Sequence, residues 1–226
     1  MTGCTVCAIF NMMFTKIKRI PALVFATCRT PVNSFNFGSA LLRGSWYIVR
    51  YSLFNRRINI SFPFKAYAPV VLNGPGRISI GKGCSVYLNV FDGLSIVTLT
   101  ARAVVSIGAK CGLAGLTIRC ADHVRMGNDC FTSASFIQDT ITINSKNPGP
   151  TAQAPSMAPK PISIGRNVWL GGQCGILGGS VIGNDCVLAA GSMTRDSTIG
   201  NYRLVMGSPS SATLPIENIL KMEGNA

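Results

Sequence analysis

A six-residue repeat constrains this chain more than any other feature. Residues 162–193 read ISIGRNVWLGGQCGILGGSVIGNDCVLAAGSM. From the first repeat position onward, every sixth residue is aliphatic until the last, which is a threonine: Ile164, Leu170, Ile176, Ile182, Leu188 and Thr194. This period matches neither the two-residue alternation of a strand nor the 3.6-residue turn of a helix. A fixed short period predicts a solenoid in which each repeat packs on the one before it.

The repeat also predicts the geometry of that solenoid. Three hexads make one triangular coil, with the aliphatic side chains pointing inward and a tight turn at each corner. Successive coils stack at the strand spacing of about 4.8 Å, which gives three parallel sheets. A glycine follows several of the repeat positions, and we expect it where a side chain would clash at a corner. The fold class predicted from the residues is therefore an all-β solenoid, a parallel β-helix.

The repeat divides the chain into three zones. Residues 1–75 are non-repetitive and basic, with helices expected over 16–28 and 39–56. Residues 76–206 are the predicted β-helix. It is interrupted at 144–161, where five prolines and the loss of period exclude a coil and indicate a projecting loop. Residues 207–226 leave the repeat and form a tail, in which IENILKMEG is expected to be a short helix.

Charge is concentrated in the first zone. Residues 1–91 carry eleven Lys and Arg and no Asp or Glu, and the rest of the chain is nearly balanced. Basic and apolar residues alternate there, which predicts peripheral association of residues 1–66 with an anionic membrane. The alternatives are a solvated basic face or packing on the acidic residues of a neighbouring subunit. No nucleic-acid module accompanies the charge, so nucleic acid is not an expected partner. No apolar stretch is long enough for a membrane span, and a cytoplasmic location is expected, peripheral at the inner membrane if the basic zone binds there.

The cysteines follow the repeat. Five of the nine lie two residues before a repeat position, where a small side chain is expected to point into the narrow interior: Cys84, Cys111, Cys130, Cys174 and Cys186. Cys4 and Cys7 form a single C-x-x-C without the second pair that a zinc site needs. A metal site is therefore not expected.

Residues 160–197, KPISIGRNVWLGGQCGILGGSVIGNDCVLAAGSMTRDS, followed by MGSPSS, resemble the C-terminal half of the hexapeptide-repeat acyltransferases. The resemblance covers roughly residues 76–211. It implies a left-handed β-helix, a homotrimer, and acetyl-CoA as co-substrate in the groove between adjacent columns. It also implies transfer of an acetyl group to a hydroxyl of a sugar or polysaccharide precursor.

The resemblance also implies site residues. Small or aromatic residues that match the motif are expected to flank the pantetheine arm of the cofactor, and two arginines are expected to face its phosphates: Trp169, Gly171, Gly172, Ala189, Ala190, Gly191, Arg195 and Arg203. The alternative for each glycine and alanine is that it only satisfies the geometry of the coil.

The chain departs from the family at the catalytic base. Related sequences have a histidine a few residues after an aspartate, just before the projecting loop, because a histidine near neutral pKa can accept and return a proton. Here Asp139 is present, but Ile143 or Asn144 stands at the position of that histidine. The chain has one histidine, His123, about one coil earlier. His123 is either a relocated base, with Asp139 or Asp122 near it, or an ordinary polar residue at a corner.

Three functions are compatible with these residues. The first is an active O-acetyltransferase that uses His123 or another arrangement. The second is an inactive protein of the same fold that binds CoA or a glycan. The third is a trimeric assembly protein that its basic zone brings to a membrane.

Overall fold

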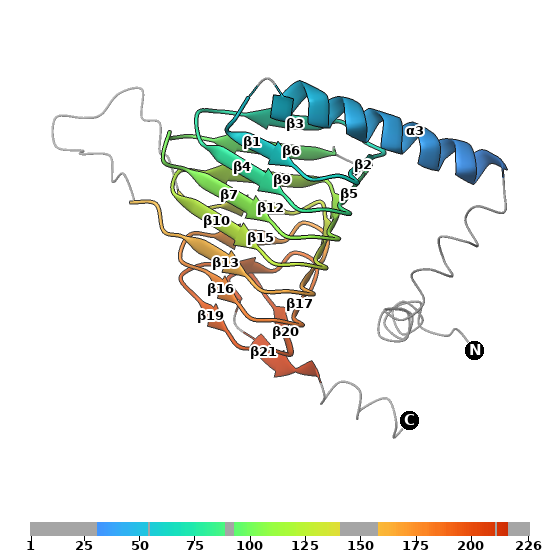
Figure 1. The fold of residues 1–226 in the computed structure, drawn as a ribbon. Helices are drawn as coiled ribbons and strands as arrows, with labels where there is room; N and C mark the ends of the chain where they lie inside the picture. Colours follow the sequence, from blue (N-terminus) through green and yellow to red (C-terminus); the bar gives the residue numbers. More distant parts are fainter. Residues whose placement is uncertain (1–30, 54, 89–92, 141–157, 211, 217–226) are drawn as a thin grey trace, which may run out of the picture. The chain divides into compact units, whose positions relative to one another are not determined.

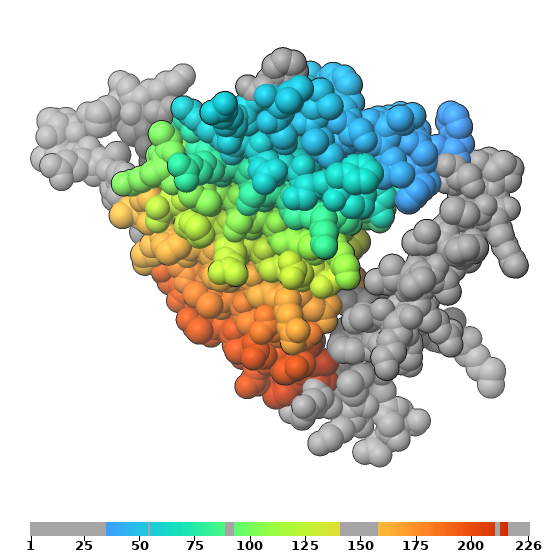
Figure 2. All heavy atoms as spheres, in the orientation of Figure 1, coloured from blue at the N-terminus to red at the C-terminus, as the bar shows by residue number. Residues whose placement is uncertain are grey.

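The hexads form strands because each places an aliphatic residue inside and its neighbours outside, as in the burial pattern of alternating exposed and buried residues along β10. The computed structural model describes residues 31–53, 55–88, 93–140, 158–210 and 212–216. Three parallel sheets run around a left-handed β-helix, and Figure 1 shows the coils narrowing toward the C-terminal end. Residues 41–226 form one compact unit, and residues 1–40 are a separate one. In Figure 2 the coils follow one another as bands of colour down the column.

The chain passes through the three sheets in turn, so each coil contributes one strand to each. Sheet A contains β1 (Ile58–Ile60), β4 (Arg77–Ile80), β7 (Val104–Ile107), β10 (His123–Met126), β13 (Ile162–Ile164), β16 (Val181–Ile182) and β19 (Thr198–Ile199). Sheet B contains β2 (Lys65–Ala66), β5 (Ser85–Tyr87), β8 (Gly112–Ala114), β11 (Phe131–Ser133), β14 (Trp169–Leu170), β17 (Val187–Leu188), β20 (Arg203–Met206) and β21 (Ala212–Pro215). Sheet C contains β3 (Val70–Asn73), β6 (Leu94–Thr98), β9 (Leu116–Cys120), β12 (Phe136–Gln138), β15 (Gly175–Leu177) and β18 (Met193–Thr194).

The predicted coil of three hexads occurs where the repeat is clearest. Ile164 pairs with Ile182 and Leu170 pairs with Leu188, so each inward residue lies directly over the one three hexads later. Earlier coils are longer, since Ile80 pairs with Ile107.

The β-helix begins earlier than residue 76, where the sequence placed its start. Strands β1, β2 and β3 form a complete first coil from residue 58, and its inward residues Ile60, Ala66 and Leu72 are buried. This coil was missed because Ile60 pairs with Ile80, a spacing that is not a whole number of hexads. No aliphatic–glycine pair marks its first corner.

A helix precedes this coil. Helix α3 (Pro31–Ile48) continues into a π-helical turn, η1 (Val49–Leu53), where the sequence predicted a helix over 39–56. Tyr47 and Tyr51 hold the edge of the first coil: the amide of Val70 donates to the Tyr47 hydroxyl at 3.3 Å, and the Tyr51 hydroxyl donates to the Val70 carbonyl at 3.3 Å. The edge strand is thereby covered. No described helix is long and apolar enough to cross a membrane.

The corners confirm the reason for the glycines. A Cβ added to Gly127 would lie 2.6 Å from backbone atoms of Gly165, the corresponding glycine of the next coil, and Gly165 stands in the same relation to Gly183. These glycines allow neighbouring coils to approach closely. The five cysteines predicted to point inward are buried, and so is Cys120. Thiols of this column donate to corner carbonyls of the next coil, as from Cys130 to Gly165 at 3.2 Å.

Several expectations fall on residues without a described structure. The helix over 16–28, Cys4 and Cys7 lie outside the described residues, as do all but the last residues of the 144–161 loop. The helix expected at IENILKMEG also lies outside them after Ile216. Before that point the tail forms β21, which pairs antiparallel with β20 and covers the last strand of sheet B.

Candidate functional site

Asp139 lies at the edge between sheets C and A, directly after β12 and just before the interruption of the repeat. Asp139 is 2 % exposed, and its carboxylate accepts backbone hydrogen bonds from the preceding coil. The amide of Ala121 donates at 2.8 Å and that of Asp122 at 2.7 Å, and the Cys120 thiol donates at 3.3 Å. Asp139 therefore holds the turn that leads directly into His123.

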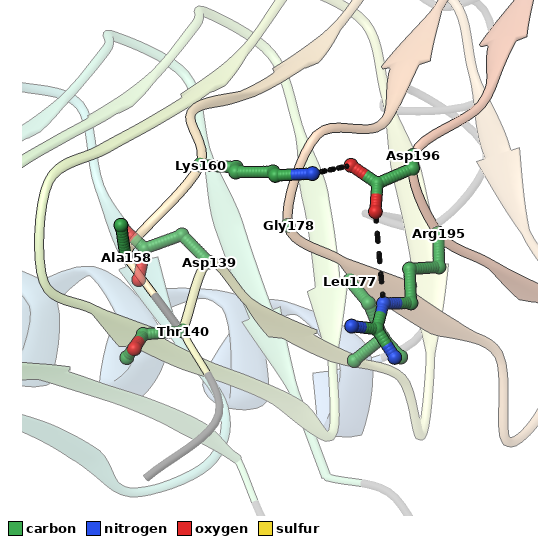
Figure 3. Close-up of a pocket in the computed structure, with 8 residues that line it drawn as sticks. All are labelled: Asp139, Thr140, Ala158, Lys160, Leu177, Gly178, Arg195 and Asp196. Carbon is green, nitrogen blue, oxygen red and sulfur yellow. Dashed lines mark hydrogen bonds and ion pairs between the residues drawn. The ribbon is translucent and has the colours of Figure 1, made fainter. Parts of the chain in front are cut away.

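The same edge contains a small cavity of about 130 Å³, shown in Figure 3. Lys160 Nζ lies 2.6 Å from one carboxylate oxygen of Asp196, and Arg195 Nε lies 3.7 Å from the other. Arg195, which the resemblance assigns to a cofactor phosphate, thus lies beside an acidic residue at this edge. Asp139 lines the cavity from the other side.

Burial and the Asp139 carboxylate act on the neighbouring thiol. Burial first, and then the charge and hydrogen bond of Asp139, raise the pKa of Cys120 to about 12. The thiol therefore stays protonated at neutral pH and serves as a hydrogen-bond donor to Asp139.

His123 lies elsewhere, on the outer surface of sheet A. It is the first residue of β10 and is exposed, since it alternates with the buried Val124. It lines a groove of about 720 Å³ across β7, β10 and β13. Asp139 does not line this groove, and the structure gives no hydrogen bond between the two residues. The two residues assigned to catalysis therefore lie at separate cavities, and Asp139 reaches His123 only through the turn at Ala121 and Asp122.

The groove also contains two arginines that the sequence analysis did not assign. Arg125 stands two residues after His123 on the same outward face, between Ser106 of β7 and Ser163 of β13. Arg166 lines the groove from the edge between sheets A and B. The hexad phase could have placed Arg125 beside Ser163, because each directly precedes a repeat position. Two arginines beside a histidine make this groove suited to an anionic group.

The edge between sheets B and C gathers most residues assigned to the cofactor. Gly171 and Gly172 follow β14, and Ala189, Ala190 and Gly191 follow β17 on the next coil. The amide of Gly191 donates to the Gly172 carbonyl at 2.8 Å. A Cβ at Gly172 or Gly191 would meet no atom within 4 Å, so no described residue fills the space beside the backbone at either position. This stretch is called the small-residue edge below.

Gly171 differs from Gly172 and Gly191. A Cβ there would lie 2.7 Å from the Leu188 carbonyl, so Gly171 is required by the coil itself. Trp169 lies on sheet B just before this edge, in edge-to-face contact with Phe131 at 6.2 Å between ring centroids. Its indole N–H is buried and has no hydrogen-bond partner among the described residues. Such a donor normally finds a partner.

The eight residues assigned to the cofactor lie at all three edges of the column. Arg195 follows β18 at the edge between sheets C and A, and Arg203 begins β20 at the edge between sheets A and B. Neither is at the small-residue edge. In a triangular column the edge between two sheets is opposite the third sheet, so the small-residue edge faces away from the groove that contains His123.

A sequence model of the family described as "Bacterial transferase hexapeptide (six repeats)" matches residues 161–196. This region is similar to the bacterial transferase hexapeptide repeat. It includes Trp169, the small-residue edge and Arg195, and the resemblance to the hexapeptide-repeat acyltransferases is confirmed. The sequence matches no curated protein.

Several solved structures are similar to this chain. A variant of AntD, an N-acyltransferase from Bacillus cereus in complex with dTDP and coenzyme A, matches with a TM-score of 0.51 and 17% identity, over 75% of this chain and 90% of that one. A putative acetyltransferase from Bacillus cereus matches with a TM-score of 0.49 and 16% identity, over 74% and 83%. Galactoside acetyltransferase in complex with coenzyme A matches with a TM-score of 0.45 and 17% identity, over 82% and 85%. At 17% identity the likeness to the AntD variant concerns the fold alone.

Proposed function

We propose that this protein is an acyltransferase that moves an acetyl group from acetyl-CoA to a hydroxyl of a sugar or polysaccharide precursor. The observation that carries the proposal is the open backbone of the small-residue edge within the matched repeat. An extended pantetheine chain must come close to the backbone, and the absence of side chains at Gly172 and Gly191 leaves that space free. The coenzyme A complex of the AntD variant, which has the same fold, supports this choice of co-substrate.

The cofactor fits the polar groups at this edge. The unpartnered indole N–H of Trp169 is a donor that a bound carbonyl could satisfy. Arg203 and Arg195 remain proposed phosphate contacts, and because they lie at other edges, each would act from a neighbouring copy or on a part of the cofactor remote from the thioester.

We assign the general base to His123. Bound acetyl-CoA supplies a reactive thioester. His123 accepts the proton of the acceptor hydroxyl while the hydroxyl oxygen bonds to the carbonyl carbon of the thioester. The carbon–sulfur bond then breaks, and the proton passes from His123 to the departing thiolate. Arg125 and Arg166 bind an anionic part of the acceptor, such as the phosphate of an activated or lipid-linked sugar.

Asp139 takes a positioning role in this proposal. Its carboxylate already accepts hydrogen bonds from Ala121 and Asp122, the two residues before His123. It therefore orients the start of β10 and does not take part in proton transfer.

The proposed site requires more than one copy of the chain. The small-residue edge and the groove of His123 lie on opposite sides of one column, so a thioester held at the first cannot reach the second. A cyclic homotrimer brings the edge of one copy against sheet A of the next, which completes the site at each of three equivalent interfaces. The proposed location is the cytoplasm. Association with a membrane is a separate proposal, because it depends on the N-terminal helix and not on the transfer site.

The test combines ligand binding and turnover. Acetyl-CoA should raise the melting temperature of the purified protein, because a ligand that binds only the folded state stabilises it. His123→Ala should retain this shift and lose about 10²-fold or more of transfer to a sugar acceptor. Arg125→Gln should raise the KM for the acceptor. The matched control is Arg77→Gln, which changes an arginine on the same outward face of sheet A two coils earlier.

A second function follows from the hydrogen bonds of Asp139. Its carboxylate is engaged by backbone amides, and neither Ile143 nor Asn144 can act as a base. If His123 is only a surface residue, the protein binds CoA or a glycan without turnover. A thermal shift without acetyl transfer would favour this function, and full transfer by His123→Ala would remove His123 from the mechanism. The absence of any shift would favour an assembly protein.

A further inference from the structure

Four large apolar side chains form an exposed row along the segment that covers the first coil. Leu42, Trp46, Val49 and Leu53 are 75%, 54%, 50% and 72% exposed. Their spacings of four, three and four residues place them on one face of the helix. This row is called the apolar stripe below. It is unusual because an amphipathic helix on a protein surface normally turns its apolar side inward.

The stripe cannot turn inward because the other side of the helix is already packed. Gly44 lies directly against the backbone of Phe64, where a Cβ would overlap the carbonyl oxygen. Tyr47 and Tyr51 bind the backbone of Val70 and pack against the core. The two faces of the segment are therefore both apolar, and only one is covered by the described residues.

The charges beside the stripe have a single sign. Arg43, Arg50, Arg56 and Arg57 lie along or just after it, and the chain has no acidic residue before position 92. The Arg50 guanidinium lies 5.1 Å from the centroid of the Trp46 ring and 5.6 Å from that of Tyr51. None of these arginines forms an ion pair within the described residues.

We propose that the apolar stripe and its arginines are a docking surface for an anionic phospholipid bilayer. Leucine and valine side chains enter the boundary of the acyl chains, Trp46 lies at the level of the headgroups, and the arginines contact lipid phosphates. A second copy of the chain fits less well, because two such surfaces facing each other would bring eight arginines together without an acidic partner.

Docking in this way has a geometric consequence. Residues 41–53 lie at the first-coil end of the column, which is blue in Figures 1 and 2. The bilayer would therefore meet this end, and sheet A with its groove would stand at the side of the column. The surface is independent of the proposed acyl transfer, because it contains no residue of that site.

The test uses the full-length protein and vesicles of phosphatidylcholine with or without phosphatidylglycerol. The chain has two tryptophans, so in a Trp169→Phe background the fluorescence reports Trp46 alone. We expect sedimentation with the anionic vesicles at low salt, a blue shift of Trp46 emission, and quenching by brominated lipid chains. Binding should weaken as salt rises.

Two variants locate the surface. Leu42→Gln combined with Leu53→Gln should reduce partitioning by at least tenfold, while Val181→Gln, an exposed apolar residue on a remote coil, should not change it. Arg43→Gln combined with Arg50→Gln should cost about fivefold per charge on anionic vesicles only. All four altered side chains of these double variants are exposed, so an unchanged melting temperature is the check that the fold is intact.

Three results would overturn the proposal. The first is no binding to anionic vesicles. The second is binding that survives the Leu42→Gln and Leu53→Gln changes without any response of Trp46, which would place the contact elsewhere. The third is an oligomer that these changes dissociate while vesicles have no effect, which would identify a second copy as the partner. Acyl transfer to a soluble acceptor should be unaffected by the stripe variants, so this test and that of the proposed function fail separately.

Discussion

Asp139 lies beside a cavity, but its carboxylate oxygens are already engaged in hydrogen bonds. It is almost fully buried, and its oxygens are bound by the amides of Ala121 and Asp122 and by the Cys120 thiol. Hydrogen bonds to a charged acceptor are stronger than those between neutral groups. Losing the acceptor would leave two backbone donors without this partner.

Replacing Asp139 should therefore reduce the stability of the folded protein. Asp139→Ala should lower the free energy of unfolding by about 1–3 kcal/mol and accelerate amide exchange at Ala121 and Asp122. Asp139→Asn keeps one oxygen acceptor and should recover part of the loss. Urea denaturation and hydrogen exchange measure both effects. Asp129→Asn, an exposed aspartate on the next corner, is the control. Unchanged exchange at Ala121 and Asp122 in the alanine variant would exclude the positioning role.

The raised pKa of Cys120 predicts that the stability of the protein falls at alkaline pH. Its thiol has a pKa of about 12 in the folded protein, above the ordinary value of a free thiol near 8.5, because it is buried beside a carboxylate. Above that ordinary value the unfolded chain loses the proton while the folded chain keeps it. The contribution of this proton to stability is complete below about pH 8.5 and is lost as pH rises toward about pH 12.

The measurement is the pH dependence of unfolding. The free energy of unfolding should fall as pH rises from about 8 to about 10.5, and Cys120→Ala should make this fall shallower. Ile118→Val removes a methyl group from the same strand without removing a proton, so it controls for the loss of packing. Parallel pH profiles in the wild type and Cys120→Ala would contradict the prediction.

At the scale of the coil, the decisive contacts are those between corner glycines. From Gly81 onward, the glycine after the inward aliphatic residue that ends each strand of sheet A stacks on the corresponding residue of the next coil. The last member, Gly200, has no coil beyond it, and a Cβ there would meet no atom within 4 Å. A glycine is therefore required at this corner inside the stack and is not required at its end.

This difference provides a matched pair of substitutions. Gly165→Ala would place a methyl group 2.6 Å from the Gly183 carbonyl oxygen, and we expect it to destabilise the protein by about 1–3 kcal/mol. Gly200→Ala adds the same methyl group at the end of the stack and should leave stability unchanged or slightly increased. Thermal unfolding of the two variants tests the comparison. Equal losses would show that backbone conformation, and not the stacking of coils, selects these glycines.

The repeat predicted the interior of the column well, because side-chain direction follows directly from a six-residue period. It predicted that Cys84, Cys111 and Cys130 point inward, and they are buried. It failed where coil length changes: the first coil departs from the spacing of three hexads, so Ile60 was not recognised as an inward residue.

The site was harder to predict than the core, because its residues depend on pairing across an interruption. Arg125 pairs with Ser163 across the 144–161 interruption, so the hexad phase, and not the distance along the sequence, indicates that they are neighbours. The hydrogen bonds of Asp139 were also not predicted, although Ile137 and Asp139 lie two residues apart and thus point to the same side. Proximity to the loop suggested chemistry, whereas the inward direction indicates a structural hydrogen-bond acceptor.

At the scale of the whole molecule, the proposed site takes its residues from two opposite sides of the column. This arrangement predicts how variants of the two sides behave together. Variants that each inactivate one side should complement each other. His123→Ala removes the base, and Gly172→Trp adds a bulky side chain to the small-residue edge at a position where a Cβ would meet no atom within 4 Å. Each variant alone should be inactive, because all of its interfaces carry the same defect.

Mixed trimers of the two variants should recover about a third of the wild-type activity, because every mixed cyclic trimer has one interface that joins the intact edge of a His123→Ala copy to the intact His123 of a Gly172→Trp copy. The measurement is acetyl transfer by co-expressed trimers purified through a different tag on each variant. Pairing His123→Ala with the double variant His123→Ala and Gly172→Trp gives no intact interface and is the control. Hybrids that stay inactive, while co-expressed wild-type copies are active, would place the whole site within one chain and remove the need for the trimer.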